Sequence, residues 1–142
     1  AKRDGMRLIS VVMGAKSDAG RASANQALLN YGFRFFETRQ LYKANEKLAD
    51  VRVWKGAETN VPVGLTNDLY VTIPRKHYDR LKATVDVDKQ IGAPVEKGKP
   101  LGRVNISLND EVVTQVPLVA LKEVGEGGLF RRLVDHVRMM AE

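Results

Sequence analysis

The segment VNISLNDEVVTQVPLVAL, residues 104–121, decides the fold class of this chain. In its first part apolar residues alternate with polar ones, at Val104, Ile106 and Leu108. This period of two is typical of a strand that buries one face. The dipeptide Asn109-Asp110 then favours a tight turn, and an apolar run follows it. The segment therefore predicts an antiparallel β-hairpin.

The same period of two occurs in three segments that precede the hairpin. The alternating apolar positions are Ala49, Val51 and Val53, then Leu69, Val71 and Ile73, then Leu81, Ala83, Val85 and Val87. The stretch PVEKGKPLG, residues 94–102, supplies glycine and proline for another turn. Several short, half-buried strands joined by turns predict a small antiparallel β-sandwich or barrel over residues 38–124.

The residues before this β region have a different pattern. MRLISVVM, residues 6–13, is apolar on both faces and predicts a strand that is covered on both sides. Ser17 is a suitable N-cap, and a helix face follows at Ala24, Leu28, Tyr31 and Phe35. One strand and one helix cannot form a domain, so residues 1–37 are predicted to belong to a larger unit. Without their neighbours they are expected to self-associate through the exposed strand.

The residues after the β region predict an amphipathic helix. Gly125, Gly127 and Gly128 interrupt the β pattern, and the Gly127-Gly128 pair is expected to be flexible. At about 100° per residue, one arc of about 140° holds Leu129, Phe130, Leu133, Val134, Val137 and Met140. The opposite side holds Arg131, Arg132, Asp135, His136 and Arg138. The pattern alone is equally compatible with a helix packed on the β region and with a helix lying at a membrane surface.

The composition limits the partners without selecting one. The 142 residues carry a formal net charge of +6, and the lysines and arginines are scattered rather than clustered. A basic β-barrel that binds nucleic acid is the alternative function. The chain has only one Trp, four Tyr and four Phe, and no aromatic cluster interleaved with basic residues on a strand. We therefore expect no nucleic acid partner.

The motifs that would carry catalysis or metal binding are missing from the sequence. His77 and His136 have no metal-ligand spacing, and the chain has no cysteine, so no metal and no cofactor are predicted. SAN at residues 23–25 and SLN at residues 107–109 match the S-x-N element of penicillin-recognising enzymes. Such short matches occur by chance, and neither an S-x-x-K nor a K-T-G motif is present. No catalytic residue is predicted.

Seven segments in order resemble the C-terminal part of low-molecular-mass penicillin-binding proteins, the D-alanyl-D-alanine carboxypeptidases of the penicillin-binding protein 5 type. They are KRDGMRLISVVMG, YGFRFFET, VWKG, VTIPR, LKA, APVEKGKPLG and PLVAL. The resemblance implies a periplasmic protein of peptidoglycan maturation, in which a β domain follows a serine acyl-enzyme domain and a terminal amphipathic helix attaches to the inner membrane. On this reading residues 1–37 are the last strand and helix of the catalytic domain, residues 38–124 the β domain, and residues 125–142 the membrane-associating helix.

The resemblance also implies the partners of each part. Residues 1–37 would contact the catalytic domain of the parent protein, and the β domain would act as a spacer that can bind peptidoglycan or cell-wall proteins. Leu129, Phe130, Leu133, Val134, Val137 and Met140 would enter the outer leaflet of the inner membrane, with Arg131, Arg132 and Arg138 at the lipid headgroups. The helix would be about 21 Å long, too short for a hydrocarbon core of about 30 Å, and would therefore lie in the interface. Because the enzyme motifs would all precede Ala1, this chain is predicted to be inactive alone.

Overall fold

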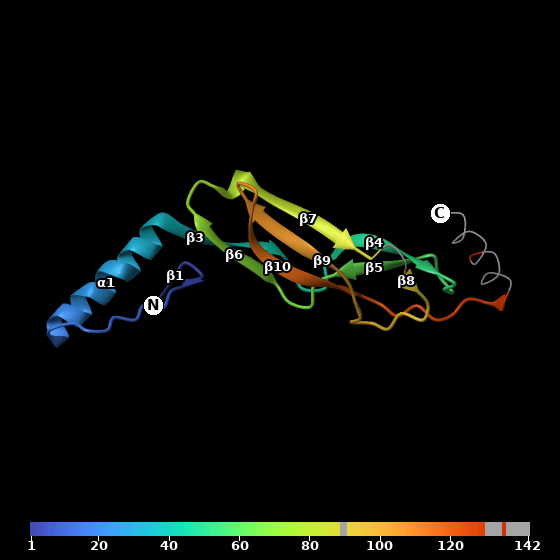
Figure 1. Cartoon of the computed structure of the whole chain (residues 1–142), viewed down its shortest axis with the longest axis horizontal. Coiled ribbons are helices and arrows are strands. Elements are labelled where there is room, and N and C mark those ends of the chain that lie inside the picture. Colours follow the sequence, from blue (N-terminus) through green and yellow to red (C-terminus); the bar gives the residue numbers. More distant parts are fainter. Residues whose placement is uncertain (89–90, 130–134, 136–142) are drawn as a thin grey trace. The chain divides into compact units, whose positions relative to one another are not determined.

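The computed structural model describes residues 1–88, 91–129 and 135 (Figure 1). Strands are the predominant regular structure of the described residues, which confirms the predicted mainly β fold class. In chain order the elements are β1 (Lys2–Arg3), β2 (Met6–Arg7), α1 (Asp18–Phe35), β3 (Phe36–Tyr42), β4 (Lys47–Trp54), β5 (Asn60–Gly64), β6 (Leu69–Pro74), the 3-10 helix η1 (Tyr78–Arg80), β7 (Leu81–Val87), β8 (Ile91–Gly92), β9 (Pro100–Leu108) and β10 (Glu111–Ala120).

The chain divides into two compact units. The first, here called the N-terminal unit, comprises Ala1–Arg39 together with Tyr70–Arg80. The second, here called the β unit, comprises Gln40–Leu69 and Leu81–Glu142. The N-terminal unit is thus discontinuous in sequence, because most of β6 and η1 belong to it.

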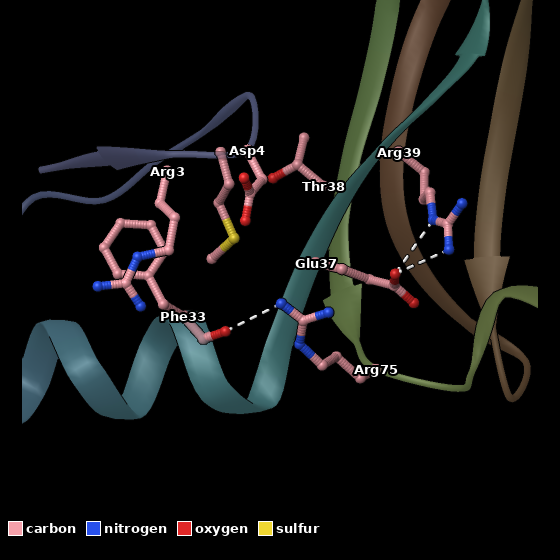
Figure 2. Close-up of a pocket in the computed structure, with 8 residues that line it drawn as sticks. Arg3, Asp4, Phe33, Glu37, Thr38, Arg39 and Arg75 are labelled. Atoms are coloured by element: carbon pink, nitrogen blue, oxygen red, sulfur yellow. Dashed lines mark hydrogen bonds and ion pairs between the residues drawn. The ribbon is translucent and has the colours of Figure 1, made fainter.

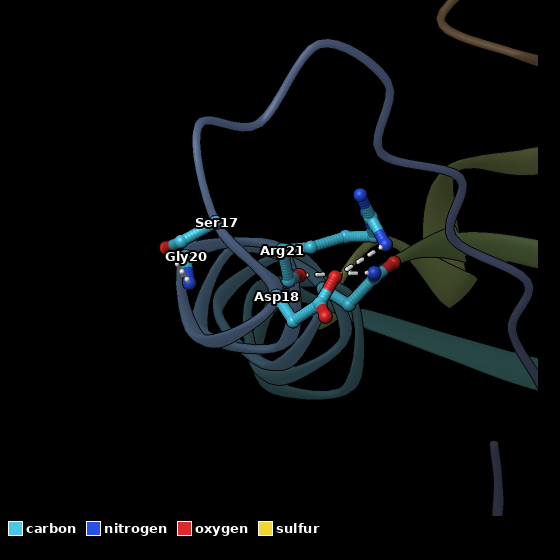
Figure 3. A network of polar contacts seen from close by, with 5 residues as sticks. Ser17, Asp18, Gly20 and Arg21 are labelled. Carbon is cyan, nitrogen blue, oxygen red and sulfur yellow. Dashed lines mark hydrogen bonds and ion pairs between the residues drawn. The ribbon is translucent and has the colours of Figure 1, made fainter.

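Helix α1 begins where the sequence predicts. The Ser17 side chain accepts a hydrogen bond of 3.1 Å from the Gly20 N–H, which satisfies one of the free donors of the first turn. Asp18 adds a negative charge at this end and forms an ion pair of 2.9 Å with Arg21 (Figure 3). The helix ends at Phe35, and the chain continues directly into β3, which pairs with β6. The N-cap prediction at Ser17 is confirmed.

The predicted strand over residues 6–13 is not formed in this chain. Only Met6 and Arg7 are in a strand, paired with β1 in a short hairpin, and residues 8–13 have no regular secondary structure. Leu8 still exchanges two backbone hydrogen bonds with Ala1, at 2.9 and 2.8 Å. A strand needs a neighbour that accepts and donates its backbone hydrogen bonds, and no described strand pairs with residues 9–13. This part of the chain instead contacts α1, where the Ser10 hydroxyl donates a hydrogen bond of 2.7 Å to Asn25 Oδ1.

The β unit is built on one sheet in the order β7-β9-β10-β5-β4-β8. Its neighbouring strands are antiparallel, with the exception of β4 and β8, which are parallel. The hairpin predicted at Asn109-Asp110 is confirmed, since Leu108 pairs with Glu111 across these two residues. Both turn residues have positive φ, 52° and 68°, as a two-residue turn with the twist of the strands requires.

The buried face of this sheet includes some of the alternating residues that the sequence indicates, Val51, Val53, Val104 and Ile106, and also residues that the pattern did not indicate, such as those of β5. The described core residues of the β unit include Val51, Val53, Val61, Val63, Leu65, Leu101, Val104, Ile106 and Leu118, each no more than 4% exposed. β7 differs from the prediction of a half-buried strand, because residues 82–86 are all exposed. β7 lies at the edge of the sheet, so its side chains have a neighbouring strand on one side only.

Candidate functional site

The N-terminal unit exposes an apolar surface, here called the α1 face, which consists of Leu28, Tyr31 and Phe35. These side chains are 52%, 58% and 47% exposed, and the rings of Tyr31 and Phe35 lie 4.7 Å apart. Leu28, Tyr31 and Phe35 are three of the four residues of the predicted helix face, but in this chain nothing described covers them. Adjacent large apolar side chains in water mark a surface that binds another surface.

A second set of exposed apolar side chains lies in residues 8–13. Ile9, Val11 and Met13 are 75%, 74% and 88% exposed, although the sequence predicts a strand covered on both faces. The other side of α1 is occupied, because Phe33 is buried and Gly32 leaves no room for a Cβ beside the Leu8 side chain. Residues 8–13 and the α1 face are therefore the part of the N-terminal unit most suited to packing against further protein.

A polar cavity of about 250 Å³ lies in the same unit, between α1, β3, β6 and the β1-β2 turn (Figure 2). Glu37 accepts from the Arg39 guanidinium at 3.0 and 3.1 Å, and Arg75 Nη2 donates to the Phe33 carbonyl at 3.0 Å. The Arg3 guanidinium lies 4.7 Å from the centre of the Phe33 ring. Each arginine is thus engaged by a group of the chain itself. These contacts tie α1 to the strands, and they offer no nucleophile paired with a base.

The end of β4 is a point where several segments of the β unit meet. Lys55, directly after β4, has a left-handed backbone with φ +59°. Its carbonyl accepts from the Gly127 N–H at 2.8 Å, and its N–H donates to Asp135 Oδ2 at 2.8 Å. Ala57 N–H donates to the Gly125 carbonyl at 2.8 Å. We call Lys55, Gly56 and Ala57 the Lys55 turn.

The glycine segment after β10 is consequently packed, not free. Glu126 bridges Gly56 in antiparallel fashion, and Gly127 is buried. A Cβ on Gly127 would lie 2.7 Å from the Gly56 carbonyl oxygen. The expectation of a flexible Gly127-Gly128 pair is therefore wrong for Gly127, which is required for a close approach of two backbones. Gly128 has nothing within 4 Å of its Cβ position.

The predicted membrane residues are almost all outside the described part of the chain. Leu129 is described and is 86% exposed. Phe130, Leu133, Val134, Val137, Met140, Arg131, Arg132 and Arg138 lie outside the described residues. Over the ranges that the structure covers, no helix combines the length and the apolar character needed to cross a bilayer.

The described residues of the motifs considered for catalysis form hydrogen bonds or turns that stabilise the local structure. Asn25 of the SAN match accepts from Ser10 and donates to the Arg21 carbonyl at 3.0 Å. Asn109 of the SLN match forms the hairpin turn. His77 Nδ1 lies 2.9 Å from the Arg75 carbonyl, and His136 is outside the described residues. Within the described ranges no three metal-binding side chains gather.

Sequence reasoning missed the position of Asp135. It treated this residue only as a member of the charged side of the last helix, whereas its side chain is nine-tenths buried against the Lys55 turn. No local signal in the sequence pairs Asp135 with Lys55, since the two residues are 80 positions apart.

The architecture is that of a small sheet domain joined to a helical unit whose apolar surface is uncovered. Residues 36–126 match the family model of the penicillin-binding protein 5 C-terminal domain. The chain therefore belongs to this family, as the ordered segments of the sequence predict.

Similar proteins extend the match over nearly the whole chain. It is 41% identical over 140 residues to the D-alanyl-D-alanine carboxypeptidase DacC of Escherichia coli K12, covering 98% of this chain and 35% of that protein. It is 38% identical over 136 residues to DacA of the same organism, covering 95% and 34%. The crystal structure of penicillin-binding protein 5 from Haemophilus influenzae matches with a TM-score of 0.76 and 32% identity, over 81% of this chain and 34% of that one. The chain thus spans about a third of the length of these relatives.

Proposed function

We propose that this chain forms the C-terminal part of a periplasmic D-alanyl-D-alanine carboxypeptidase, in which it connects the catalytic domain to the inner membrane. The observation that carries the proposal is the match of nearly the whole chain to one third of such enzymes. In this arrangement the N-terminal unit completes the catalytic domain, the β unit is a spacer, and the C-terminal segment associates with the outer leaflet.

The uncovered apolar residues of the N-terminal unit support its packing against a catalytic domain. Ile9, Val11 and Met13, together with the α1 face, would leave water on such packing. Burial gains about 25 cal/mol per Å² of apolar surface, so these side chains favour a covered state. About two thirds of the relatives' length lies outside the matched part. We propose that this part provides the covering domain.

A chimera tests this packing. In the chimera, this chain replaces the corresponding C-terminal part of Escherichia coli DacC. The release of D-alanine from a pentapeptide is then measured. We expect an active, monomeric chimera, and we expect Leu28→Asp to lower its melting temperature and activity because a carboxylate would be buried. Val112→Asp is the matched control, since Val112 is 64% exposed on the β9-β10 hairpin. Equal behaviour of the two variants contradicts the packing.

The chain alone is proposed to lack carboxypeptidase activity. It carries no serine followed three residues later by lysine and no K-T-G motif, so the activated nucleophile of the relatives' chemistry is not supplied. Intact-mass analysis after treatment with penicillin should show the unmodified mass. An acyl adduct on any serine would overturn this part of the proposal.

The membrane role is supported by the apolar arc of the sequence-predicted helix and by the exposure of Leu129. Burial of such a face gains about 0.8 kcal/mol per CH₂ group, and each arginine near anionic lipid adds about 1 kcal/mol. Leu133→Glu should abolish sedimentation with vesicles of phosphatidylethanolamine and phosphatidylglycerol and leave the melting temperature unchanged. A lowered melting temperature with unchanged lipid binding would instead identify a helix packed on the β unit.

A further inference from the structure

Strand β7 leaves one edge of the β unit's sheet open. It is the first strand in the order β7-β9-β10-β5-β4-β8, and no described strand pairs with its outer edge. Its seven residues, LKATVDV, include no proline and no glycine, and they pair with β9 in an unbroken register from Leu81 to Val87. Proline, bulges and very short strands normally protect an edge from further pairing. β7 has none of these, so its edge is suited to accept another strand.

The backbone groups that face this edge follow from the pairing with β9. The Asp88 N–H donates to the Leu101 carbonyl at 3.1 Å, which makes these two residues a hydrogen-bonded pair. Such pairs alternate along an antiparallel ladder, so residues 82, 84 and 86 also direct their N–H and C=O groups towards β9. The N–H and C=O groups of residues 81, 83, 85 and 87 therefore point away from β9, into the open edge.

The side chains of β7 place apolar and charged groups on opposite faces of the sheet. Val85 lies opposite the fully buried Val104, yet Val85 is 45% exposed because no strand follows on its other side. Lys82 and Asp86 project from the other face and are mostly exposed, and Asp86 lies no closer than 3.9 Å to its partner Arg103. The edge thus carries one positive and one negative charge, four residues apart, instead of charges of one sign.

We propose that β7 pairs with β7 of a second copy of this chain, in antiparallel orientation and in full overlap. Full overlap places Leu81 of one copy opposite Val87 of the other, and the two-fold axis then passes beside Thr84. Ala83 comes opposite Val85. Because both residues direct their backbone groups into the open edge, each Ala83–Val85 pair exchanges two N–H···O bonds.

The same register matches the charges. It places Lys82 of each copy opposite Asp86 of the other, so both of these cross-strand pairs join opposite charges. Lys82 and Asp86 occupy non-hydrogen-bonded positions of this pairing, where opposed Cα atoms are only about 4.5 Å apart. On the other face, Ala83 and Val85 of the two copies cover each other. Backbone register and charge therefore select the same partner, a second copy of the chain.

The size of this contact determines when it forms. Each copy contributes one strand of seven residues, whereas a stable protein interface contains about 20–30 residues a side. The pairing is therefore weak. β7 does not join two copies at the low concentration of an activity assay, but it pairs them when their local concentration is high. This inference is independent of the proposed function, since it rests on β7 and β9 alone.

A single cysteine at the two-fold axis tests the register, because the chain has no cysteine of its own. In the proposed pairing the two Thr84 Cα atoms lie about 4.5 Å apart, a separation that a disulfide spans. With a mild oxidant and at submillimolar concentration, Thr84→Cys should form a disulfide-linked dimer about ten-fold faster than Val112→Cys. Val112 is the matched control, since it is 64% exposed on the β9-β10 hairpin. Equal rates of the two variants would overturn the pairing.

Charge reversal tests the choice of partner. Lys82→Asp brings two carboxylates together in both cross-strand pairs, and Asp86→Lys brings two ammonium groups together. Each variant by itself should therefore have a dimer Kd about ten-fold higher than the chain with the original charges, measured by sedimentation velocity. An equimolar mixture of the two variants restores opposite charges in both pairs, and it should recover dimerisation.

The mixture also separates this pairing from other modes of association. All samples carry Leu28→Asp, because a charge on the exposed α1 face opposes association through that face. Any remaining association of the N-terminal unit is the same in every sample, so it cannot favour the mixture over the separate variants. A mixture that sediments as the average of its two components would overturn the proposal.

Discussion

Gly127 and Gly128 are adjacent in sequence but have opposite structural requirements, and alanine substitution should separate them. In Gly127→Ala the new Cβ would lie 2.7 Å from the Gly56 oxygen, 3.1 Å from the Gly56 carbonyl carbon and 3.2 Å from the Lys55 oxygen. All three are backbone atoms, so the segment after β10 has to move away from the Lys55 turn. The movement breaks the hydrogen bonds from Gly127 to Lys55 and from Ala57 to Gly125.

The expected cost follows from these two hydrogen bonds. At about 0.5–1.5 kcal/mol for each, Gly127→Ala should lower the free energy of unfolding by about 1–3 kcal/mol. For a domain of about 60–100 residues, each kcal/mol lowers the melting temperature by about 4–8 °C.

Thermal unfolding, together with amide exchange at Ala57 and Gly127, measures the effect. Gly128→Ala is the control, because its Cβ would meet nothing within 4 Å, and it should leave the melting temperature and both amides nearly unchanged. Equal effects of the two substitutions would refute the argument, since they would show that both glycines serve only as flexible spacers.

Three further substitutions test the β unit. Ile106→Ala removes a side chain that is 0% exposed, and it should cost about 2–5 kcal/mol in urea unfolding. Gly102→Ala places a Cβ 2.8 Å from Val87 Cα and should weaken the pairing of β7 with β9, seen as faster amide exchange along β7. The hydrogen bond and charge of Lys82 lower the pKa of Asp110 from its ordinary value, so Lys82→Met should raise this pKa in an NMR titration. The pKa of Asp110 is lower in the folded than in the unfolded chain. The Lys82–Asp110 pair therefore stabilises the fold at pH values above the unfolded pKa of Asp110, and this stabilisation is lost as the pH falls through its folded pKa.

The hairpin of β9 and β10 shows which parts of the fold local sequence can predict. Alternation at Val104 and Ile106 selects the buried face, and both residues are 0% exposed. Asn109 and Asp110 tolerate positive φ better than most residues, so they also locate the turn. These features depend on near neighbours in the chain, and for this reason the sequence specifies them without knowledge of the tertiary fold.

Features that depend on distant partners were not predictable in the same way. Residues 9–13 have the composition of a strand, but composition supplies no partner for their backbone hydrogen bonds, and they are not paired with any described strand. β7 has the correct alternation, yet its position at the sheet edge leaves residues 82–86 exposed. The Asp135 contact joins residues 80 positions apart, a separation over which the pattern carries no information.

Helix α1 has an apolar face that the sequence predicts to be buried but that is exposed in the structure. On another side of the helix, Leu8 lies against Gly32, Ser10 bonds Asn25, and the Arg3 guanidinium lies over the buried Phe33 ring. The side that the sequence predicts to be buried, the α1 face, is nevertheless exposed. A helix with apolar residues on two sides is typical of the interior of a larger unit, because a helix at a protein surface needs only one apolar stripe. The pattern therefore predicts burial correctly only if a further domain covers the α1 face, and the chimera with its Leu28→Asp variant decides whether the catalytic domain of a relative does so.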